Sequence, residues 1–289
     1  MFSIENDYLK IKVNARGAEL TSVFSKAAQL HYLWNGDPVY WAKHSPVLFP
    51  VVGALKNDMY HFENKTYTLS RHGFAREMDF ELTAQSDHSL TFTLLSNSST
   101  LEKYPFEFSL AIRYTLELNK IKVHYSVVNM GDHPMYFSIG GHPAFRVPLE
   151  QNKAFEDYYI EFAESETAHR WPVSHEGLVE ALPVDELINT NILLLTHELF
   201  NRDAVIFKYL NSKSLKLKSH TSSHCIEFHF DGFPFLGIWS AKSGNFVCIE
   251  PWCGIADSVT GHQQLIQKEG INMITPGQVF NREWSVELF

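Results

Sequence analysis

Apolar and polar residues alternate with a period of two along most of the chain. The first run is Tyr8–Val13, in which Leu9, Ile11 and Val13 would share one face of a β-strand. Glycine, asparagine, aspartate, serine and proline usually separate the runs, as they do between strands. The pattern therefore predicts many short strands and stacked sheets. The further runs are Lys65–Leu69, Ser89–Leu95, Phe106–Leu118, Lys120–Val128, Ala204–Phe207, Ser214–Leu217, His224–Phe230 and Gly244–Ile249.

Two long runs, Phe106–Leu118 and Lys120–Val128, flank a tight Leu-Asn-Lys connection, which is typical of an antiparallel hairpin. Helical periodicity is confined to Val184–Ile188 and Val259–Lys268, where we expect a few turns. Neither segment has the length of a helix that connects parallel strands. The sequence thus predicts an all-β, antiparallel fold with a few short helices.

No low-complexity linker, internal repeat or block of like charge divides the chain, so residues 1–289 are interpreted as one domain. The segment Glu164–Asn191 is rich in Glu, Ser and Pro and shows little alternation. We expect it to cross the surface between the sheets, and a domain boundary within it is the alternative.

Composition narrows the choice of partner. Hydrophobic residues make up 45% and charged residues 20% of the chain, which are ordinary values for a globular protein. The aromatic fraction of 14% favours strands and suits the binding of sugars. A net charge of −9 and a pI of 5.9 give little support to nucleic-acid binding. No stretch approaches the ~18 apolar residues of a membrane span, so we expect a small-molecule partner, no nucleic acid and no membrane.

The three cysteines, Cys225, Cys248 and Cys253, form no even disulfide framework. The first residues, Met1–Asp7, lack the basic and apolar regions of a signal peptide. We therefore expect a reducing compartment, the cytoplasm. A monomer and a homodimer are both compatible with the sequence.

Two histidines lie beside glycine. His72 is in Arg71–Arg76 between two arginines, and His142 stands between Gly141 and Pro143. Glycine lets another group approach closely, proline fixes the backbone, and imidazole can exchange protons near neutral pH. Taken singly, each segment fits an ordinary turn with a hydrogen-bonded histidine as well as a catalytic site.

An acidic residue, Glu250, interrupts the apolar segment Phe246–Gly254. Burial of an ionised carboxylate is strongly unfavourable unless it is paired or its pKa shifts, so Glu250 is a candidate catalytic group. Trp252 either offers a ring face to a sugar or packs in the core. The segment Ser45–Asp58 is either a ligand-delivering turn after an apolar run or a buried strand and its solvated turn.

Four motifs in this order resemble the aldose 1-epimerase (galactose mutarotase) family, closest to its LacX-like branch. They are Leu48–Gly53, His72–Arg76, Gly141–Phe145 and Cys248–Trp252. The resemblance covers nearly the whole chain, because Tyr8–Leu20 is similar to the opening strands of the family and Lys268–Glu283 to its closing segment. It implies a large antiparallel β-sandwich, the galactose mutarotase-like supersandwich, with a cleft across one sheet.

The resemblance also implies roles for three residues. Glu250 corresponds to the catalytic base, His142 to the acid at the ring oxygen, and His72 to a second histidine near that oxygen. Opening a cyclic hemiacetal requires removal of the O1 proton and protonation of O5; rotation about C1–C2 and reclosure then give the other anomer. Positioned proton transfer suits this chemistry, and no cofactor or metal is expected.

One departure from the family concerns the turn after Phe-Pro, where the family usually carries a sugar-binding arginine and this chain has Ala54. Lys56 or Arg76 are the candidates to replace it. Asp231 is a candidate for binding sugar hydroxyls, with an ordinary turn residue as the equal alternative.

Three other functions stay open at this point. Lys56, Arg71 and Arg76 could bind the phosphate of a hexose 6-phosphate, on which related branches act. Two histidines and a glutamate match a zinc hydrolase, although no His-x-x-x-His motif is present. The absent arginine leaves room for a non-catalytic carbohydrate sensor on the same scaffold.

Overall fold

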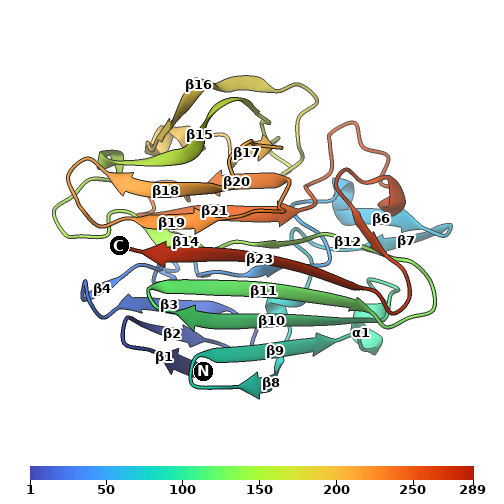
Figure 1. Cartoon of the computed structure of the whole chain (residues 1–289). Helices are drawn as coiled ribbons and strands as arrows, with labels where there is room; N and C mark the ends of the chain where they lie inside the picture. The colour runs from blue at the N-terminus through green and yellow to red at the C-terminus, as the bar shows by residue number, and fades with distance from the viewer.

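The computed structural model describes all 289 residues and has 23 strands, arranged mainly as two facing layers (Figure 1). One layer is a nine-stranded sheet in the order β16-β15-β18-β19-β23-β11-β10-β9-β8, with every neighbouring pair antiparallel. Its strands are β8 (Glu81–Gln85), β9 (Ser89–Leu95), β10 (Phe108–Glu117), β11 (Lys120–Asn129), β15 (Tyr158–Arg170), β16 (Val184–Leu194), β18 (Ser214–Ser219), β19 (Ile226–His229) and β23 (Val279–Leu288).

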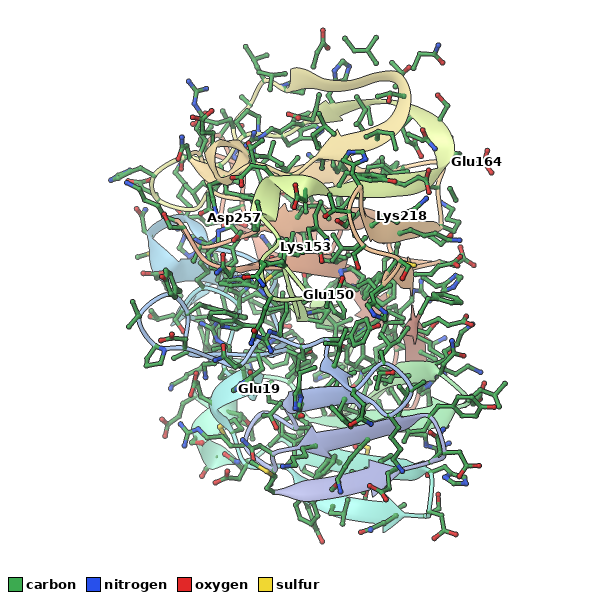
Figure 2. All side chains as sticks on the ribbon, turned by 90° about the vertical axis from the view of Figure 1, so that its left-hand side faces the viewer. Glu19, Glu150, Lys153, Glu164, Lys218 and Asp257 are labelled. Carbon is green, nitrogen blue, oxygen red and sulfur yellow. The ribbon has the colours of Figure 1, made fainter.

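The second layer contains a six-stranded sheet in the order β17-β20-β21-β13-β5, with β14 also paired to β21. Its strands are β5 (Val47–Leu48), β13 (Ile139–Gly141), β14 (Ala144–Arg146), β17 (Val205–Lys208), β20 (Phe235–Trp239) and β21 (Phe246–Cys253). A four-stranded sheet faces β8 to β11 in the lower half of the molecule, as the side view shows (Figure 2). It is formed by β1 (Phe2–Glu5), β2 (Leu9–Val13), β3 (Leu20–Ser25) and β4 (Leu30–His31).

The remaining elements are short. Two strand pairs are formed by β6 (Met59–Phe62) with β7 (Lys65–Thr68) and by β12 (Met135–Phe137) with β22 (Asn272–Ile274). The helices are α1 (Ser98–Leu101) and the 3-10 turns η1 (Lys56–Asp58), η2 (Ala75–Glu77), η3 (Phe155–Asp157), η4 (His197–Phe200) and η5 (Leu265–Gln267). None of these helices has the length and hydrophobicity needed to cross a lipid bilayer. The all-β antiparallel prediction is confirmed.

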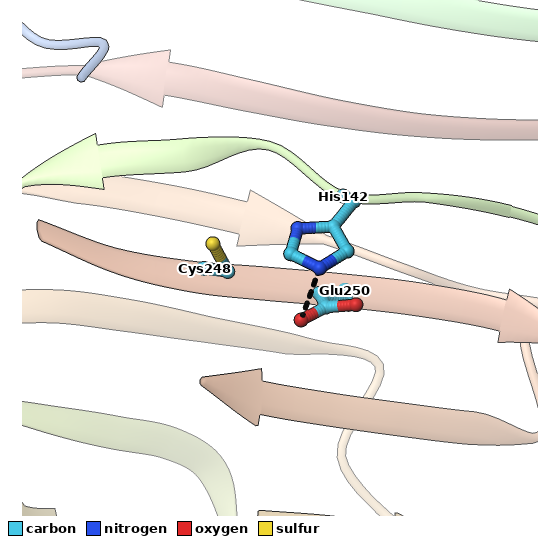
Figure 3. A group of neighbouring side chains, drawn as sticks. All are labelled: His142, Cys248 and Glu250. Carbon is cyan, nitrogen blue, oxygen red and sulfur yellow. Dashed lines mark ion pairs between the residues drawn. The ribbon is translucent and has the colours of Figure 1, made fainter. Parts of the chain in front are cut away.

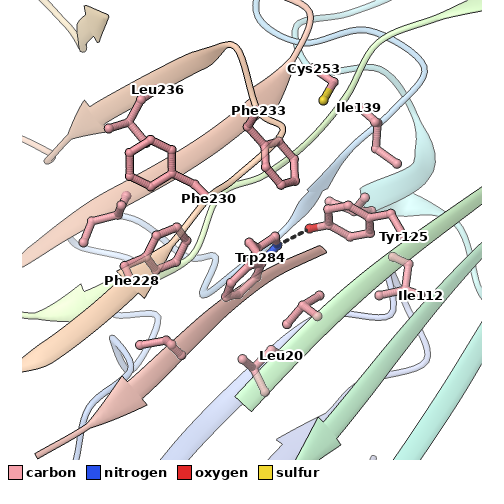
Figure 4. Close-up of a cluster of buried hydrophobic side chains, with 14 of the residues drawn as sticks. Leu20, Ile112, Tyr125, Ile139, Phe228, Phe230, Phe233, Leu236, Cys253 and Trp284 are labelled. Carbon is pink, nitrogen blue, oxygen red and sulfur yellow. Dashed lines mark hydrogen bonds between the residues drawn. The ribbon is translucent and has the colours of Figure 1, made fainter. Parts of the chain in front are cut away.

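Side chains from both layers meet in a common core (Figure 4). Trp284 of β23 donates its indole N–H to the Tyr125 hydroxyl at 2.9 Å, and Phe228 stacks on Trp284 with 5.2 Å between ring centroids. The core cluster contains 64 buried residues and extends from Ile4 to Leu288. This extent supports the expected single domain, which stays a prediction.

The strand predictions agree with the structure where alternation is regular. β9 has the expected bounds, and the expected hairpin is formed by β10 and β11, with Leu118 in the connecting turn at a φ of 54°. Alternation identifies these strands because one face of each is buried and the other is not.

The segment Glu164–Asn191 differs from the expectation. It supplies much of β15 and β16, a long hairpin at the edge of the nine-stranded sheet, and Val184–Ile188 is extended strand rather than helix. Irregularities in register between Glu161 and His169 break the two-residue alternation, so the local pattern hid the strands. In the second predicted helical segment, only η5 forms.

The strand β21 is buried on both faces and separates core from cleft. Val247 and Ile249 point into the main core, whereas Cys248, Glu250 and Trp252 lie on the opposite face. The sequence expectation of a cleft across one sheet therefore has a definite place, the face of the six-stranded sheet turned away from the nine-stranded sheet.

Candidate active site

A cleft of about 300 Å³ lies on this outer face. Its floor contains residues of β20 and β21, and its walls come from the turns near His72 and Trp41 and from the connection between β15 and β16. Seven of the predicted residues or motif neighbours line it: Gly53, Arg71, His72, Arg76, His142, Glu250 and Trp252.

The floor depends on glycine in the strands next to β21. Glu250 is paired with Gly237 of β20, and Trp252 is paired with Gly140 of β13. A Cβ atom at Gly237 would lie 2.5 Å from the Trp252 indole, and one at Gly140 would lie 2.6 Å from it. The indole can lie across both strands because neither neighbour has a side chain.

His142 and Glu250 form a close pair on this floor (Figure 3). His142 lies in the short connection between β13 and β14, and its backbone N–H donates to the Pro46 carbonyl. Its Nε2 lies 3.2 Å from Oε1 of Glu250, and the two residues are only 7% and 2% exposed. Trp41 stacks on the imidazole with 4.8 Å between ring centroids, which fixes the plane of the ring.

Burial sets the protonation of this pair. Desolvation, with a smaller effect of nearby Arg71 and Arg76, lowers the pKa of His142 to about 3. Desolvation also raises the pKa of Glu250 well above its usual value, with Arg71 acting in the opposite direction. Both shifts favour the uncharged groups, a protonated carboxyl beside a neutral imidazole.

His72 has a constrained backbone and a defined tautomer. Its φ is +69°, and its backbone N–H donates to the Gly53 carbonyl at 2.9 Å. The Gly53 N–H in turn donates to Nδ1 of His72 at 3.1 Å. Burial and the neighbouring His142 ring hold the pKa of His72 well below its usual value. Neutral His72 therefore carries its proton on Nε2 and is a hydrogen-bond donor.

Arginines form one wall of the cleft. The Arg71 guanidinium is paired with Asp203 at 3.2 Å, and Arg76 donates to the Arg71 carbonyl at 2.9 Å. A Cβ at Gly177 would lie 3.2 Å from the Ala54 Cβ and 3.3 Å from Nη1 of Arg71. The Arg71 guanidinium and the short Ala54 side chain thus both lie beside Gly177.

Two residues expected to bind substrate do not line the cleft. Lys56 is in η1, where its ammonium group donates to the Val259 carbonyl at 2.8 Å. Asp231 is exposed in the turn at which the chain crosses from β19 in one sheet to β20 in the other. Sequence proximity to a motif did not bring either side chain to the cleft, because each turn leads away from it.

Among the cleft residues that were not predicted, three have aromatic or charged side chains: Trp41, Asp203 and Trp239. None of the three lies in one of the motifs from which the site was predicted. Asp203 is 132 positions from its partner Arg71 in the sequence. The only local signal is the presence of tryptophan beside flexible turns, and it does not distinguish a cleft residue from a core residue.

The structure also groups ligand-type atoms. One atom each of His142, Cys248 and Glu250 lies within 4.8 Å of the other two, and all three residues are buried. This set differs from the zinc set considered from the sequence, because Cys248 takes the place of His72.

Comparisons with known proteins agree with this architecture. The family model for aldose 1-epimerase matches residues 1–264. The chain is 32% identical over 295 residues to the chromosomal LacX protein of Lactococcus lactis subsp. lactis, covering 99% of this chain and 98% of that protein.

Two solved structures are similar over the full length. A galactose mutarotase related enzyme from Lactobacillus acidophilus has a TM-score of 0.95 and 36% identity, covering 100% of this chain and 97% of that one. A galactose mutarotase-like protein from Lactobacillus casei has a TM-score of 0.94 and 34% identity, with full coverage of both chains. The fold expected from the motif resemblance is confirmed.

Proposed function

The chain belongs to the aldose 1-epimerase family, and we propose that it interconverts the α and β anomers of a hexose by acid-base opening and closure of the sugar ring. The observation that carries the proposal is the contact of 3.2 Å between Nε2 of His142 and Oε1 of Glu250 on the floor of the cleft. O1 and O5 of an aldose are bonded to the same carbon, so adjacent proton donor and acceptor groups can reach both oxygens at once.

The single proton of the pair makes the reaction reversible. Transfer of the carboxyl proton from Glu250 to Nε2 of His142 creates a carboxylate and an imidazolium without changing the net charge. Glu250 then takes the proton from O1 while His142 gives its proton to O5, the C1–O5 bond breaks and C1=O1 forms. The products leave the pair as it began, and reclosure on the other face of C1 reverses each transfer.

Other cleft residues supply positioning. His72 offers its Nε2–H, and the buried Trp252 indole N–H has no hydrogen-bond partner within the protein, so both can donate to sugar oxygens. Arg71 and Asp203 provide a donor and an acceptor for hydroxyl groups. In this proposal Arg71 takes the role of the arginine that Ala54 does not supply.

A hexose 6-phosphate is the second candidate substrate. Nε of Arg76 is buried without a hydrogen-bond partner, and Arg71 lines the same wall, so the two cations could receive a phosphate. Asp203 weighs against this candidate, because its carboxylate already pairs with Arg71 and would repel the phosphate.

Polarimetry on freshly dissolved α-glucose, α-galactose and hexose 6-phosphates tests the proposal. We expect the optical rotation of a free hexose to relax faster in proportion to the protein concentration. Acceleration only with phosphate esters would replace the substrate. Sugar binding without acceleration for any aldose would indicate the non-catalytic sensor.

A further inference from the structure

A buried thiol lies next to the proposed acid-base pair and has no role in the reaction. Cys248 precedes Glu250 by two residues on β21, so both side chains project from the same face of the strand (Figure 3). The Cys248 side chain is fully buried beside Trp34 and Phe246. Its sulfur, a ring nitrogen of His142 and a carboxylate oxygen of Glu250 are mutually within 4.8 Å.

These three atoms are the kinds that zinc prefers. Thiolate, imidazole and carboxylate ligands bind Zn²⁺ at about 2.0–2.3 Å, which places ligand atoms on one tetrahedral ion roughly 3.5 Å apart. His142 and Glu250 are already 3.2 Å apart. The sulfur lies within 4.8 Å of a ring nitrogen and of a carboxylate oxygen, so a side-chain shift of about 1 Å brings the ligand atoms to this spacing.

A second observation concerns the hydrogen bonds of the His142 ring nitrogens. Nε2 of His142 lies 3.2 Å from the Glu250 carboxylate, and the other ring nitrogen, Nδ1, is buried without a hydrogen-bond partner. An ion bound through Nε2 therefore replaces the contact with Glu250 and breaks no other hydrogen bond of the ring.

Charge balance favours a divalent ion here. The ion is bound by the thiolate of Cys248 and the carboxylate of Glu250. The thiolate and the carboxylate then neutralise the two positive charges, with neutral imidazole as the third ligand. A site of zero net charge avoids most of the desolvation penalty that a buried ion would otherwise cause.

We propose that Cys248, His142 and Glu250 form a three-ligand site for Zn²⁺ or a similar thiol-binding divalent ion, and that the bound ion inhibits the protein. The ion occupies the proton donor and acceptor of the pair, so neither can exchange a proton with a sugar. The binding part is independent of the proposed function, whereas the inhibition rests on it.

Cobalt is the direct probe of the binding part, because a Co²⁺–thiolate bond produces a charge-transfer absorption band in the near ultraviolet. Titration of chelator-treated, full-length protein with Co²⁺ is expected to develop this band and saturate at one equivalent. Cys248→Ala should abolish the band, and Cys225→Ala should retain it as the matched cysteine control. Absence of the band in the wild type, or its persistence in Cys248→Ala, overturns the proposal.

Zinc affinity gives a second readout. Loss of groups around a metal site typically weakens binding ~10–100-fold, so removal of the Cys248 ligand should weaken Zn²⁺ binding by at least about 100-fold. Equal Zn²⁺ affinity of the wild type and Cys248→Ala contradicts the site, and thermal melting of both proteins shows whether the variant is folded.

The inhibition is tested separately by polarimetry. Zn²⁺ should slow anomer exchange by the wild type, while Cys248→Ala should retain activity and resist the ion. Equal inhibition of both proteins overturns the inhibitory site. If neither protein accelerates exchange, the proposed function fails, and the Co²⁺ titration still decides the metal site.

Discussion

At the scale of single residues, burial and charge oppose each other in the cleft. His72, His142 and Glu250 are each less than 8% exposed, and desolvation moves the pKa of each toward its neutral form. An exposed histidine-glutamate pair would ionise as a salt bridge. The buried pair instead shares one proton, which is suited to a reaction that begins and ends with the same protonation.

Replacement of the proposed base tests this arrangement. Glu250→Gln keeps the size of the side chain but cannot accept the O1 proton, so we expect catalysis of anomer exchange to fall by ~100–10,000-fold. Glu166→Gln is the control, because Glu166 is equally buried but accepts hydrogen bonds from Asn211 and Ser212 outside the cleft. Full activity in Glu250→Gln would remove Glu250 from the mechanism.

A methyl group in the floor tests the glycine requirement. In Gly237→Ala the new Cβ meets the Trp252 indole, so the ring has to move, and overpacking of this kind costs about 1–3 kcal/mol. We expect lower sugar affinity, measured by calorimetry, and reduced stability in urea unfolding. Gly131→Ala is the control, because its nearest contact would be an ordinary 3.5 Å. Identical behaviour of the two variants would show that the indole position is unimportant.

At the scale of elements, one strand and two turns assemble the site. β21 carries Glu250 and Trp252. Shortly after this strand, Asp257 binds the turn that follows Gly53, next to His72. The backbone N–H of Asp257 donates to the Ala54 carbonyl, and its carboxylate accepts from the Lys56 backbone N–H. The same turn contains Gly53, which fixes the His72 tautomer, so Asp257 connects the strand to the second histidine.

A buried ion pair maintains this connection. Nζ of Lys268 lies 2.6 Å from Oδ1 of Asp257, and their side chains are 3% and 8% exposed. Lys268→Met leaves a buried carboxylate unpaired and should destabilise the protein by about 3–5 kcal/mol in urea unfolding. Lys122→Met, which removes an exposed pair with Glu117, should cost less than about 1 kcal/mol. Equal effects would mean that the buried pair is not structural.

At the scale of the whole molecule, the cleft lies on the outer face of the six-stranded sheet, while the nine-stranded sheet covers the other face. The large core allows the protein to bury two histidines, because many apolar contacts offset the cost of a few buried polar groups. Stability should therefore depend on pH through the site.

The direction follows from the histidine pKa values. The unfolded chain has ordinary histidines, near pH 6.5, whereas folded His142 titrates at about 3 and the pKa of His72 is well below its usual value. Below pH 6.5 the unfolded state binds more protons, so stability falls as pH falls, by up to about 1.4 kcal/mol per pH unit for each histidine. The raised pKa of Glu250 acts oppositely above pH 4.5, where it removes stability as pH rises.

The variant His72→Asn isolates one histidine, because asparagine tolerates the positive φ at this position. Urea unfolding between pH 4 and pH 7, a range set from the usual histidine pKa, should give a flatter profile than the wild type by roughly one bound proton. Parallel profiles would show that His72 keeps an ordinary pKa in the folded protein.

The sequence by itself determined the class of fold and predicted three residues that meet in the cleft. Two-residue alternation is a local consequence of one buried face, so strands such as Ser89–Leu95 could be identified without the structure. His72, His142 and Glu250 were predicted from motif order together with the cost of burying a carboxylate, and all three line the cleft.

Only the tertiary structure decided which distant segments meet. Three contacts of the site depend on how loops from different strands converge. They are the pairing of Arg71 with Asp203, the stacking of Trp41 on His142 and the approach of Cys248 to His142. Tertiary packing also explains why Lys56 and Asp231 lie outside the cleft and why Val184–Ile188 forms a strand instead of the predicted helix. Local periodicity records whether a residue is buried, but the identity of its neighbours is fixed by the packing of the whole chain.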